Sequence, residues 1–210
     1  LLCGDGAIGN ILLNDYDVLQ LFSHCDDMRL NGKILRTVQS AGYHIARGLP
    51  YCRGDGDNHS TCGYAYGFTR NFYEKIGGIY DLHILGSSDL IFCASIVSKN
   101  LFKFDNTYSE GYNRSILEFQ KNCIGTKFGY TSTVVNHYFH GSKKSRQYAN
   151  RDKILTDNKF DPYIHLTTDE NGLYIPTSEC PQDILDRIKK YFQDRKEDEG
   201  NPQTMGYFHT

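Results

Sequence analysis

The stretch that decides the fold is residues 63–89, which read GYAYGFTRNFYEKIGGIYDLHILGSSD. It opens with alternating small and aromatic side chains, a pattern that favours a strand. Thr69 then provides an N-cap for a short helix that ends at Gly77 and Gly78. A turn of one glycine and two serines leads to Asp89, just before an apolar helix. The stretch therefore predicts a strand, a helix and a turn that carries one carboxylate toward a cleft.

Each side chain that this stretch offers to a ligand also has a simpler interpretation. Tyr64, Tyr66 and Phe68 alternate, so we expect them on one face of a strand, where sugar rings could stack on them. Packing in the core explains the same pattern, and the residues alone leave both interpretations open. Asp89 could point into a cleft, but Ser88 or Asp89 could equally cap the helix that follows.

The rest of the chain alternates short strands with helices, which favours an α/β fold. Strands are expected over 17–22 and 128–138, and helices over 90–97, 109–123 and 179–195. The last of these helices is amphipathic, with five residues expected to face inward: Ile184, Leu185, Ile188, Tyr191 and Phe192. Residues 34–43 fit either a strand or a helix, and residues 23–33 form a polar segment that ends in an Asn31-Gly32 turn.

Composition excludes several classes of protein. The chain has 23 Lys and Arg against 25 Asp and Glu, so it lacks the basic excess of a general nucleic-acid-binding protein. No apolar run approaches the ~20 residues that a membrane-spanning helix needs. The seven cysteines are odd in number and show no two-residue spacing, which favours a reducing compartment. We therefore expect a cytoplasmic protein with no membrane span and no nucleic-acid partner.

Several segments resemble one known family in order and spacing. They are residues 63–89, the helical stretch 117–120 (LEFQ) and the segment 137–148 (HYFHGSKKSRQY). Together they resemble the acceptor-side half of GT-A-fold glycosyltransferase-like proteins, which are found in bacteria, phages and giant viruses. Segments 160–166 (FDPYIHL) and 169–172 (DENG) are similar too, so that the resemblance covers residues 16 to about 199.

This resemblance implies a Rossmann-like α/β/α core and an enzyme that uses nucleotide sugars. It would move a sugar from a nucleotide-diphosphate donor to a glycan or glycoprotein acceptor, with inversion at the transferred carbon. Asp89 matches the carboxylate that takes the acceptor proton as general base. We expect contacts with the acceptor or its sugar from Tyr64, Tyr66, Arg70, Gly86, Ser87 and Ser88. Arg70 could instead form a structural pair with Asp81.

The resemblance also implies a divalent metal, Mn²⁺ or Mg²⁺, that bridges the donor diphosphate. His140 follows the last core strand and matches a metal ligand of the family. Lys143, Lys144 and Arg146 match residues that neutralise the phosphates, and Arg can do so with two parallel hydrogen bonds. From the residues alone, an exposed loop histidine and a solvated basic run explain the same segment.

The chain departs from the family at its start. GT-A enzymes place their nucleotide-binding units and an Asp-x-Asp metal motif upstream of this region, and neither Asp15-Tyr16-Asp17 nor Asp55-Gly56-Asp57 is in register for that motif. We therefore expect residues 1–156 to be a partial GT-A domain and residues 157–210 to be an extension that packs on it and ends in a frayed tail. A separate chain could carry the N-terminal half. The alternative is a non-catalytic carbohydrate-binding or pseudo-enzyme fragment without a donor site.

Overall fold

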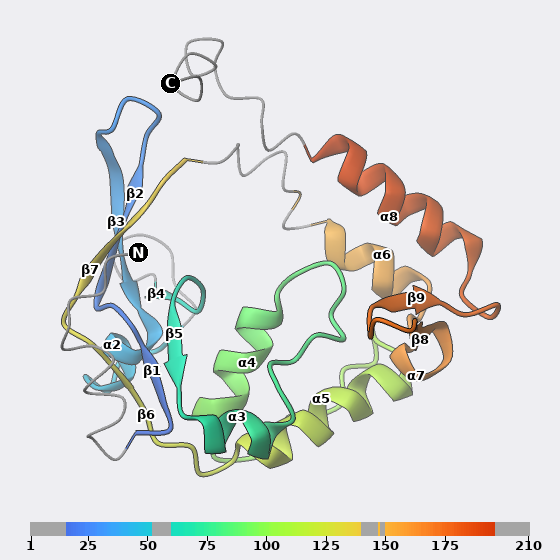
Figure 1. Ribbon diagram of the computed structural model, residues 1–210, viewed down its shortest axis with the longest axis horizontal. Coiled ribbons are helices and arrows are strands. Elements are labelled where there is room, and N and C mark those ends of the chain that lie inside the picture. Colours follow the sequence, from blue (N-terminus) through green and yellow to red (C-terminus); the bar gives the residue numbers. More distant parts are fainter. Residues whose placement is uncertain (1–15, 52–59, 140–146, 148–149, 196–210) are drawn as a thin grey trace. The chain divides into compact units, whose positions relative to one another are not determined.

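The computed structural model describes residues 16–51, 60–139, 147 and 150–195 and shows a mixed α/β protein (Figure 1). The predicted α/β class is confirmed. The chain divides into two compact units, each assembled from separate stretches of sequence. The first unit holds the described residues of 1–81 with Gly86–Leu101 and Phe119–Phe139, and the second holds Leu82–Leu85, Phe102–Glu118 and the described residues of 140–210.

The first unit is built on two small sheets. In one, β1 (Val18–Gln20) lies between β5 (Tyr66–Phe68), which is antiparallel to it, and β6 (Phe128–Tyr130), which is parallel. The other has the order β4-β3-β2-β7. Its strands are β4 (Ser60–Thr61), β3 (Ile34–Ser40), β2 (His24–Met28) and β7 (Val134–His137). The chain runs from β1 into β2 and from β6 into β7, so the same two segments supply neighbouring strands to both sheets.

The β2–β3 hairpin was only partly predicted. The Asn31-Gly32 turn is confirmed, with Gly32 at φ +75° and the Asn31 side chain accepting the Lys33 N–H at 3.1 Å. Strand β2 was missed, because a polar segment of five residues with two adjacent aspartates does not look like a strand. Its residues nevertheless alternate in burial, with Cys25 and Asp27 buried. Residues 34–43 contain both predicted alternatives, since β3 is followed directly by α2 (Ala41–Ile45).

Two helices of the first unit follow the predicted stretch. Helix α3 (Arg70–Ile76) begins at the predicted cap, where Thr69 Oγ1 accepts the Phe72 N–H at 3.2 Å, and it ends at Gly77 in the left-handed conformation. Helix α4 (Ser88–Val97) follows as expected and buries Phe92 and Cys93. Its N-cap residue is Ser87, which makes no side-chain capping bond. The prediction that Ser88 or Asp89 caps this helix is therefore wrong, because both lie within its first turn.

One cysteine of the first unit is cross-linked. Cys62 is disulfide-bonded. Free thiols are present on Cys25, Cys93, Cys123 and Cys180. Disulfides persist mainly in oxidising compartments, so this bond weighs against the reducing compartment expected from the cysteine spacing. In the part of the chain that the structure describes, no helix is both long and apolar enough to cross a membrane.

The second unit is largely helical. It contains α6 (Arg151–Asp157), α7 (Pro162–His165), the β8–β9 hairpin (Leu166–Thr168 and Tyr174–Pro176) and α8 (Gln182–Asp194), with α8 packed on α6 (Figure 1). Residues 110–118 of α5 (Glu110–Cys123) also belong to it. The core consists of Leu85, Tyr112, Ile154, Leu155, Phe160, Ile184 and Tyr191. Of the residues expected inward on α8, Phe192 is 54% exposed, so that part of the prediction is wrong.

Candidate functional site

Asp89 is exposed on the first turn of α4, where a negative charge is favoured by the helix dipole. Its Oδ1 atom accepts the N–H of Leu90 at 2.9 Å. Its Oδ2 atom lies 2.9 Å from the point where a Cβ would stand on Gly63. The structure thus brings together the carboxylate and the start of the aromatic segment. Because Gly63 has no side chain, the carboxylate can lie directly against its backbone.

The turn before Asp89 has an unusual backbone. Gly86 has φ +98° and Ser87 has φ +67°. The left-handed region is uncommon for a residue with a side chain, and such residues concentrate at functional sites. The Ser87 carbonyl accepts hydrogen bonds from the N–H groups of Leu90 and Ile91, at 3.1 and 3.2 Å, which hold the turn to the helix. Gly86 is exposed, and Ser87 and Ser88 are half-buried.

The segment facing Asp89 is fixed by Gln20, a fully buried residue of β1. Its side-chain nitrogen donates to the carbonyls of Thr61 and Gly63, at 3.0 and 3.1 Å, and its side-chain oxygen accepts the Gly42 N–H at 3.1 Å. Buried amides that satisfy both donor and acceptor in this way specify one arrangement of the neighbouring backbone. Gly63 therefore has little freedom to move away from the carboxylate.

Tyr66 is half-buried and packs against the core of the first unit. Its ring meets Phe92 edge-on at 5.3 Å between centroids and stacks on Phe128 at 6.3 Å. Its hydroxyl donates to the Cys62 carbonyl at 2.8 Å, and burial raises the pKa of this phenol well above its ordinary value. These contacts favour the packing alternative for Tyr66, and its predicted contact with a sugar stays a prediction.

Tyr64 is placed differently from Tyr66. It precedes β5 and has φ +76°, so the alternation of a strand does not extend to it. Its side chain is 41% exposed, and its ring contacts Phe22 and His137 at centroid distances of 5.7 and 4.7 Å. Its hydroxyl donates to Asp27 Oδ1 at 3.0 Å. Tyr64 thus offers an aromatic surface to solvent from an anchored position.

Asp27, which anchors Tyr64, is the site residue that sequence reasoning missed. It is only 7% exposed, and it also accepts hydrogen bonds from Arg36 Nε at 2.6 Å and His137 Nδ1 at 2.9 Å. Burial by itself raises the pKa of this carboxyl, but the hydrogen bonds from Arg36, Tyr64 and His137 outweigh burial and leave the pKa below its usual value. The signal in the sequence was the hairpin, which pairs Asp27 directly with Arg36 across the two strands.

Arg70 is exposed at the start of α3 and borders a depression of about 460 Å³. The other described residues that line it are Phe68 and Tyr73, whose rings stack at 5.5 Å with planes 9° apart. Arg70 therefore lies beside a flat aromatic surface, which is compatible with its predicted role in holding an acceptor.

The predicted donor residues His140, Lys143, Lys144 and Arg146 lie outside the described residues. Among the residues that are described, no three His, Cys, Asp or Glu side chains come close enough together to hold a metal ion.

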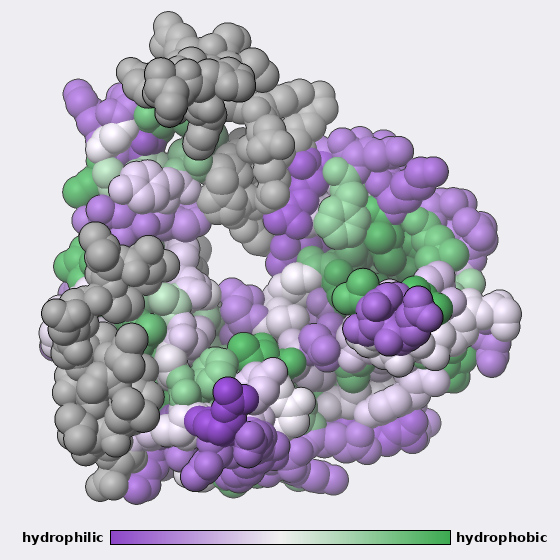
Figure 2. All heavy atoms as spheres, viewed as in Figure 1, coloured by the Kyte–Doolittle hydropathy of each residue, from purple (hydrophilic) through white to green (hydrophobic). Residues whose placement is uncertain are grey.

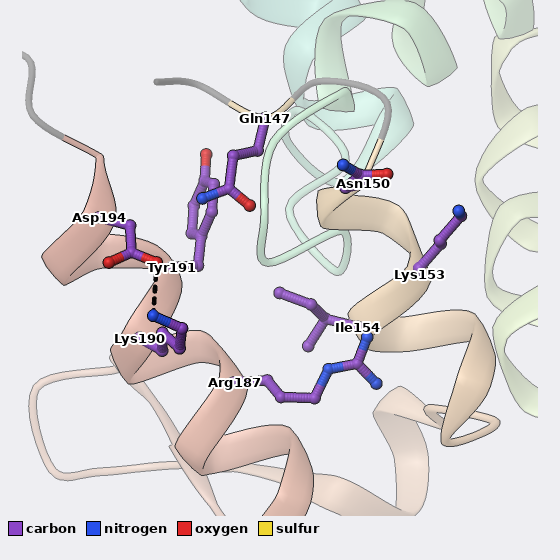
Figure 3. A pocket seen from close by; sticks show the side chains of 8 residues that line it. All are labelled: Gln147, Asn150, Lys153, Ile154, Arg187, Lys190, Tyr191 and Asp194. Carbon is purple, nitrogen blue, oxygen red and sulfur yellow. Dashed lines mark ion pairs between the residues drawn. The ribbon is translucent and has the colours of Figure 1, made fainter. Parts of the chain in front are cut away.

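The second unit has two further cavities. One, of about 310 Å³, lies between α6 and α8, with Ile154 and Tyr191 among its lining residues (Figure 3). Two of its charged groups are already paired, Lys190 with Asp194 at 2.9 Å and Arg187 with Asp157 at 3.0 Å, so they are not reserved for a charged ligand. The other, of about 270 Å³, is an apolar hollow between α8 and the β8–β9 hairpin, in a region of hydrophobic side chains (Figure 2).

The described residues of the first unit thus gather an exposed carboxylate, a strained turn and an exposed, anchored tyrosine around Gly63. No protein-family model, curated protein or solved structure matches this chain. An ionisable carboxylate beside small and aromatic residues suits a proton transfer to or from a bound hydroxyl compound.

Proposed function

We propose that this chain forms the acceptor side of a GT-A-fold glycosyltransferase that moves a sugar from a nucleotide-diphosphate donor to a glycan or glycoprotein acceptor. The observation that carries the proposal is the placement of Asp89. Its carboxylate is exposed, does not cap its helix, and lies against a glycine that leaves space beside it. A general base needs this access, because it has to come within hydrogen-bond reach of the acceptor hydroxyl.

The proposed reaction inverts the configuration of the transferred carbon. The acceptor oxygen attacks that carbon while the bond to the diphosphate oxygen breaks, and the diphosphate leaves with the electron pair. Asp89 takes the proton of the attacking hydroxyl. Tyr64, which is 41% exposed, supports the acceptor sugar. Arg70 lies beyond the other end of β5 and serves the acceptor away from that sugar. In this proposal His140 and the basic residues Lys143, Lys144 and Arg146 serve the donor diphosphate.

Titration followed by transfer assays tests this function. The chain is titrated by calorimetry with UDP- and GDP-sugars, with and without Mn²⁺, and then incubated with each donor and a panel of glycans. Asp89→Asn should lower transfer by about 100-fold or more while leaving sugar binding nearly unchanged. Glu74→Gln, at an exposed position on α3, is the matched control and should transfer normally.

Three other outcomes would contradict part or all of the proposed function. Full transfer by the Asp89→Asn variant would remove Asp89 as the base. Binding of glycans without any transfer would favour the alternative, a non-catalytic carbohydrate-binding chain. If the chain bound neither donors nor glycans, both proposals would be abandoned.

A further inference from the structure

We propose that Asp27 is a positioning residue of the acceptor site, and that its hydrogen bond to Tyr64 holds the side chain of this tyrosine in place. The inference rests on the proposed function, because it concerns how the acceptor sugar is held. Asp27 itself is buried, so it acts on a bound sugar only through Tyr64.

The backbone of Tyr64 is the first observation. A tyrosine at φ +76° occupies a region that residues with bulky side chains rarely adopt. Such a conformation persists only where surrounding contacts fix it. Here the side chain is held by the hydroxyl bond to Asp27 and the ring contacts to Phe22 and His137. The backbone on either side is held by hydrogen bonds to the Gly63 and Ala65 carbonyls, from Gln20 Nε2 at 3.1 Å and the Leu21 N–H at 2.9 Å.

The anchor itself is rigid. Asp27 lies on β2, and its hydrogen-bond donors besides Tyr64 are Arg36 on β3 and His137 on β7, the two strands that flank β2. Three adjacent strands of one sheet therefore hold the carboxylate that holds Tyr64. Hydrogen bonds to a charged group are stronger than those between neutral groups, which suits an anchor.

The buried Asp27 carboxylate would have hydrogen-bond donors even without Tyr64, so its burial does not explain the unfavourable backbone conformation of Tyr64. Oδ2 already accepts from Arg36, and Oδ1 already accepts from His137, so the buried carboxylate has a partner on each oxygen without the tyrosine. The hydroxyl of Tyr64 adds a third bond at the cost of an unfavourable backbone conformation. What this arrangement achieves is a fixed side chain on a residue that remains 41% exposed.

The peptide segment that carries Tyr64 also contacts the proposed base, Asp89. Gly63 immediately precedes Tyr64, and its carbonyl is held by Gln20 while its N–H donates to Thr61 Oγ1 at 3.2 Å. The Asp89 carboxylate lies against that same glycine. A sugar that stacks on Tyr64 is thereby placed relative to the group that would take its proton, and placement of this kind is a large part of catalysis.

Two variants and one control test the assignment. Asp27→Asn weakens the anchor, and Tyr64→Phe removes the hydroxyl but keeps the ring. Asp26→Asn changes the neighbouring carboxylate of the same strand, which accepts a hydrogen bond from Thr37 Oγ1 at 2.5 Å and points to the opposite face. Binding of the methyl glycosides of glucose, galactose and N-acetylglucosamine is measured by saturation-transfer NMR, with a thermal melt of each variant as the folding check.

We expect Tyr64→Phe and Asp27→Asn to weaken glycoside binding by about five-fold or more, as the loss of one hydrogen bond predicts, with Asp26→Asn unchanged. In transfer assays the same two variants should raise the acceptor KM, whereas Asp89→Asn lowers kcat. A purely structural role would lower the melting temperature and leave the affinity of the folded protein intact.

Three results would overturn the assignment. One is a folded Tyr64→Phe variant with wild-type affinity, and another is an Asp26→Asn variant as impaired as Asp27→Asn. In both of these the wild-type chain binds glycosides, so the proposed function survives. The third is a wild-type chain that binds none of the glycosides, which removes the proposed acceptor site and this inference with it.

Discussion

Asp89 and Gly63 lie against each other, with the Oδ2 atom of the carboxylate 2.9 Å from the position that a Cβ on the glycine would occupy. Real Cβ atoms essentially never approach an oxygen this closely, so the observed carboxylate position requires glycine. The backbone of Gly63 is not in the left-handed region, which means that the requirement comes from the contact and not from the turn.

Gly63→Ala should therefore displace the Asp89 carboxylate without unfolding the chain. We expect a change in the free energy of unfolding below about 1 kcal/mol, because the flexible end of a side chain can move away from the added methyl group. Transfer should fall by about ten-fold or more, since the base loses its position. In the Asp89→Asn background, Gly63→Ala should have no further effect on transfer. If the double variant instead lost activity by the product of the two single losses, Gly63 would act independently of Asp89.

Acid should destabilise the first unit partly through Asp27. Its pKa lies below the usual carboxyl value in the folded state, so its hydrogen bonds stabilise the fold fully at neutral pH. That stabilisation is lost as the pH falls below about 4, through the folded pKa. Urea unfolding at neutral and acid pH should show Asp27→Asn well below wild type only at neutral pH. A difference that stays constant with pH would contradict this, and Asp26→Asn is the control.

Gly111→Ala should destabilise the second unit. The Asp161 carboxylate accepts the Gly111 N–H at 3.1 Å at the start of α5 and the Tyr163 N–H at 3.0 Å at the start of α7. A Cβ on Gly111 would overlap the Asp161 carboxylate. We expect a loss of about 1–3 kcal/mol by urea unfolding, from overpacking and a lost hydrogen bond. Lys121→Ala, at an exposed position of the same helix, should change stability little. If both variants lost the same stability, the overlap with Asp161 would not be the cause.

The free thiols should differ in reactivity. Burial raises the pKa of Cys25 to about 11 and that of Cys93 and Cys123 to about 12. At pH 8 these three should react slowly with iodoacetamide, because the thiolate is the nucleophile, whereas the half-exposed Cys180 should react first. Mass spectrometry of labelled peptides gives the order. Cys62 should be labelled only after reduction, and its labelling in untreated protein would contradict the disulfide.

Local signals in the sequence predicted the elements around Asp89 well. Thr69 and Gly77 bound α3 because capping and helix termination depend on neighbouring residues alone. The start of α4 was misjudged by one or two positions, since Ser87 begins the helix through its backbone without a side-chain cap. Asp89 and Gly63 were still expected in one site, because both belong to the same stretch.

The anchor of Tyr64 depended on contacts that a local pattern does not contain. Asp27 receives hydrogen bonds from Arg36 across the hairpin and from His137 on the neighbouring strand β7, which is more than a hundred residues further along the sequence. The alternation of Tyr64 and Tyr66 predicted one shared face, but the left-handed backbone at Tyr64 ends the strand pattern before that residue. Backbone strain of this kind is set by tertiary contacts.

The C-terminal part of the chain is not a dispensable appendage. Leu85 and Tyr112, which come from the middle of the sequence, complete the same core as Phe160, Ile184 and Tyr191. Removing residues 157–210 would expose the side chains of Leu85 and Tyr112 to water, because three of the side chains that pack in this core would be lost. Among the described residues, each of the two units is assembled from more than one stretch of sequence. Expression of a shortened version should yield an aggregation-prone protein rather than a minimal acceptor domain.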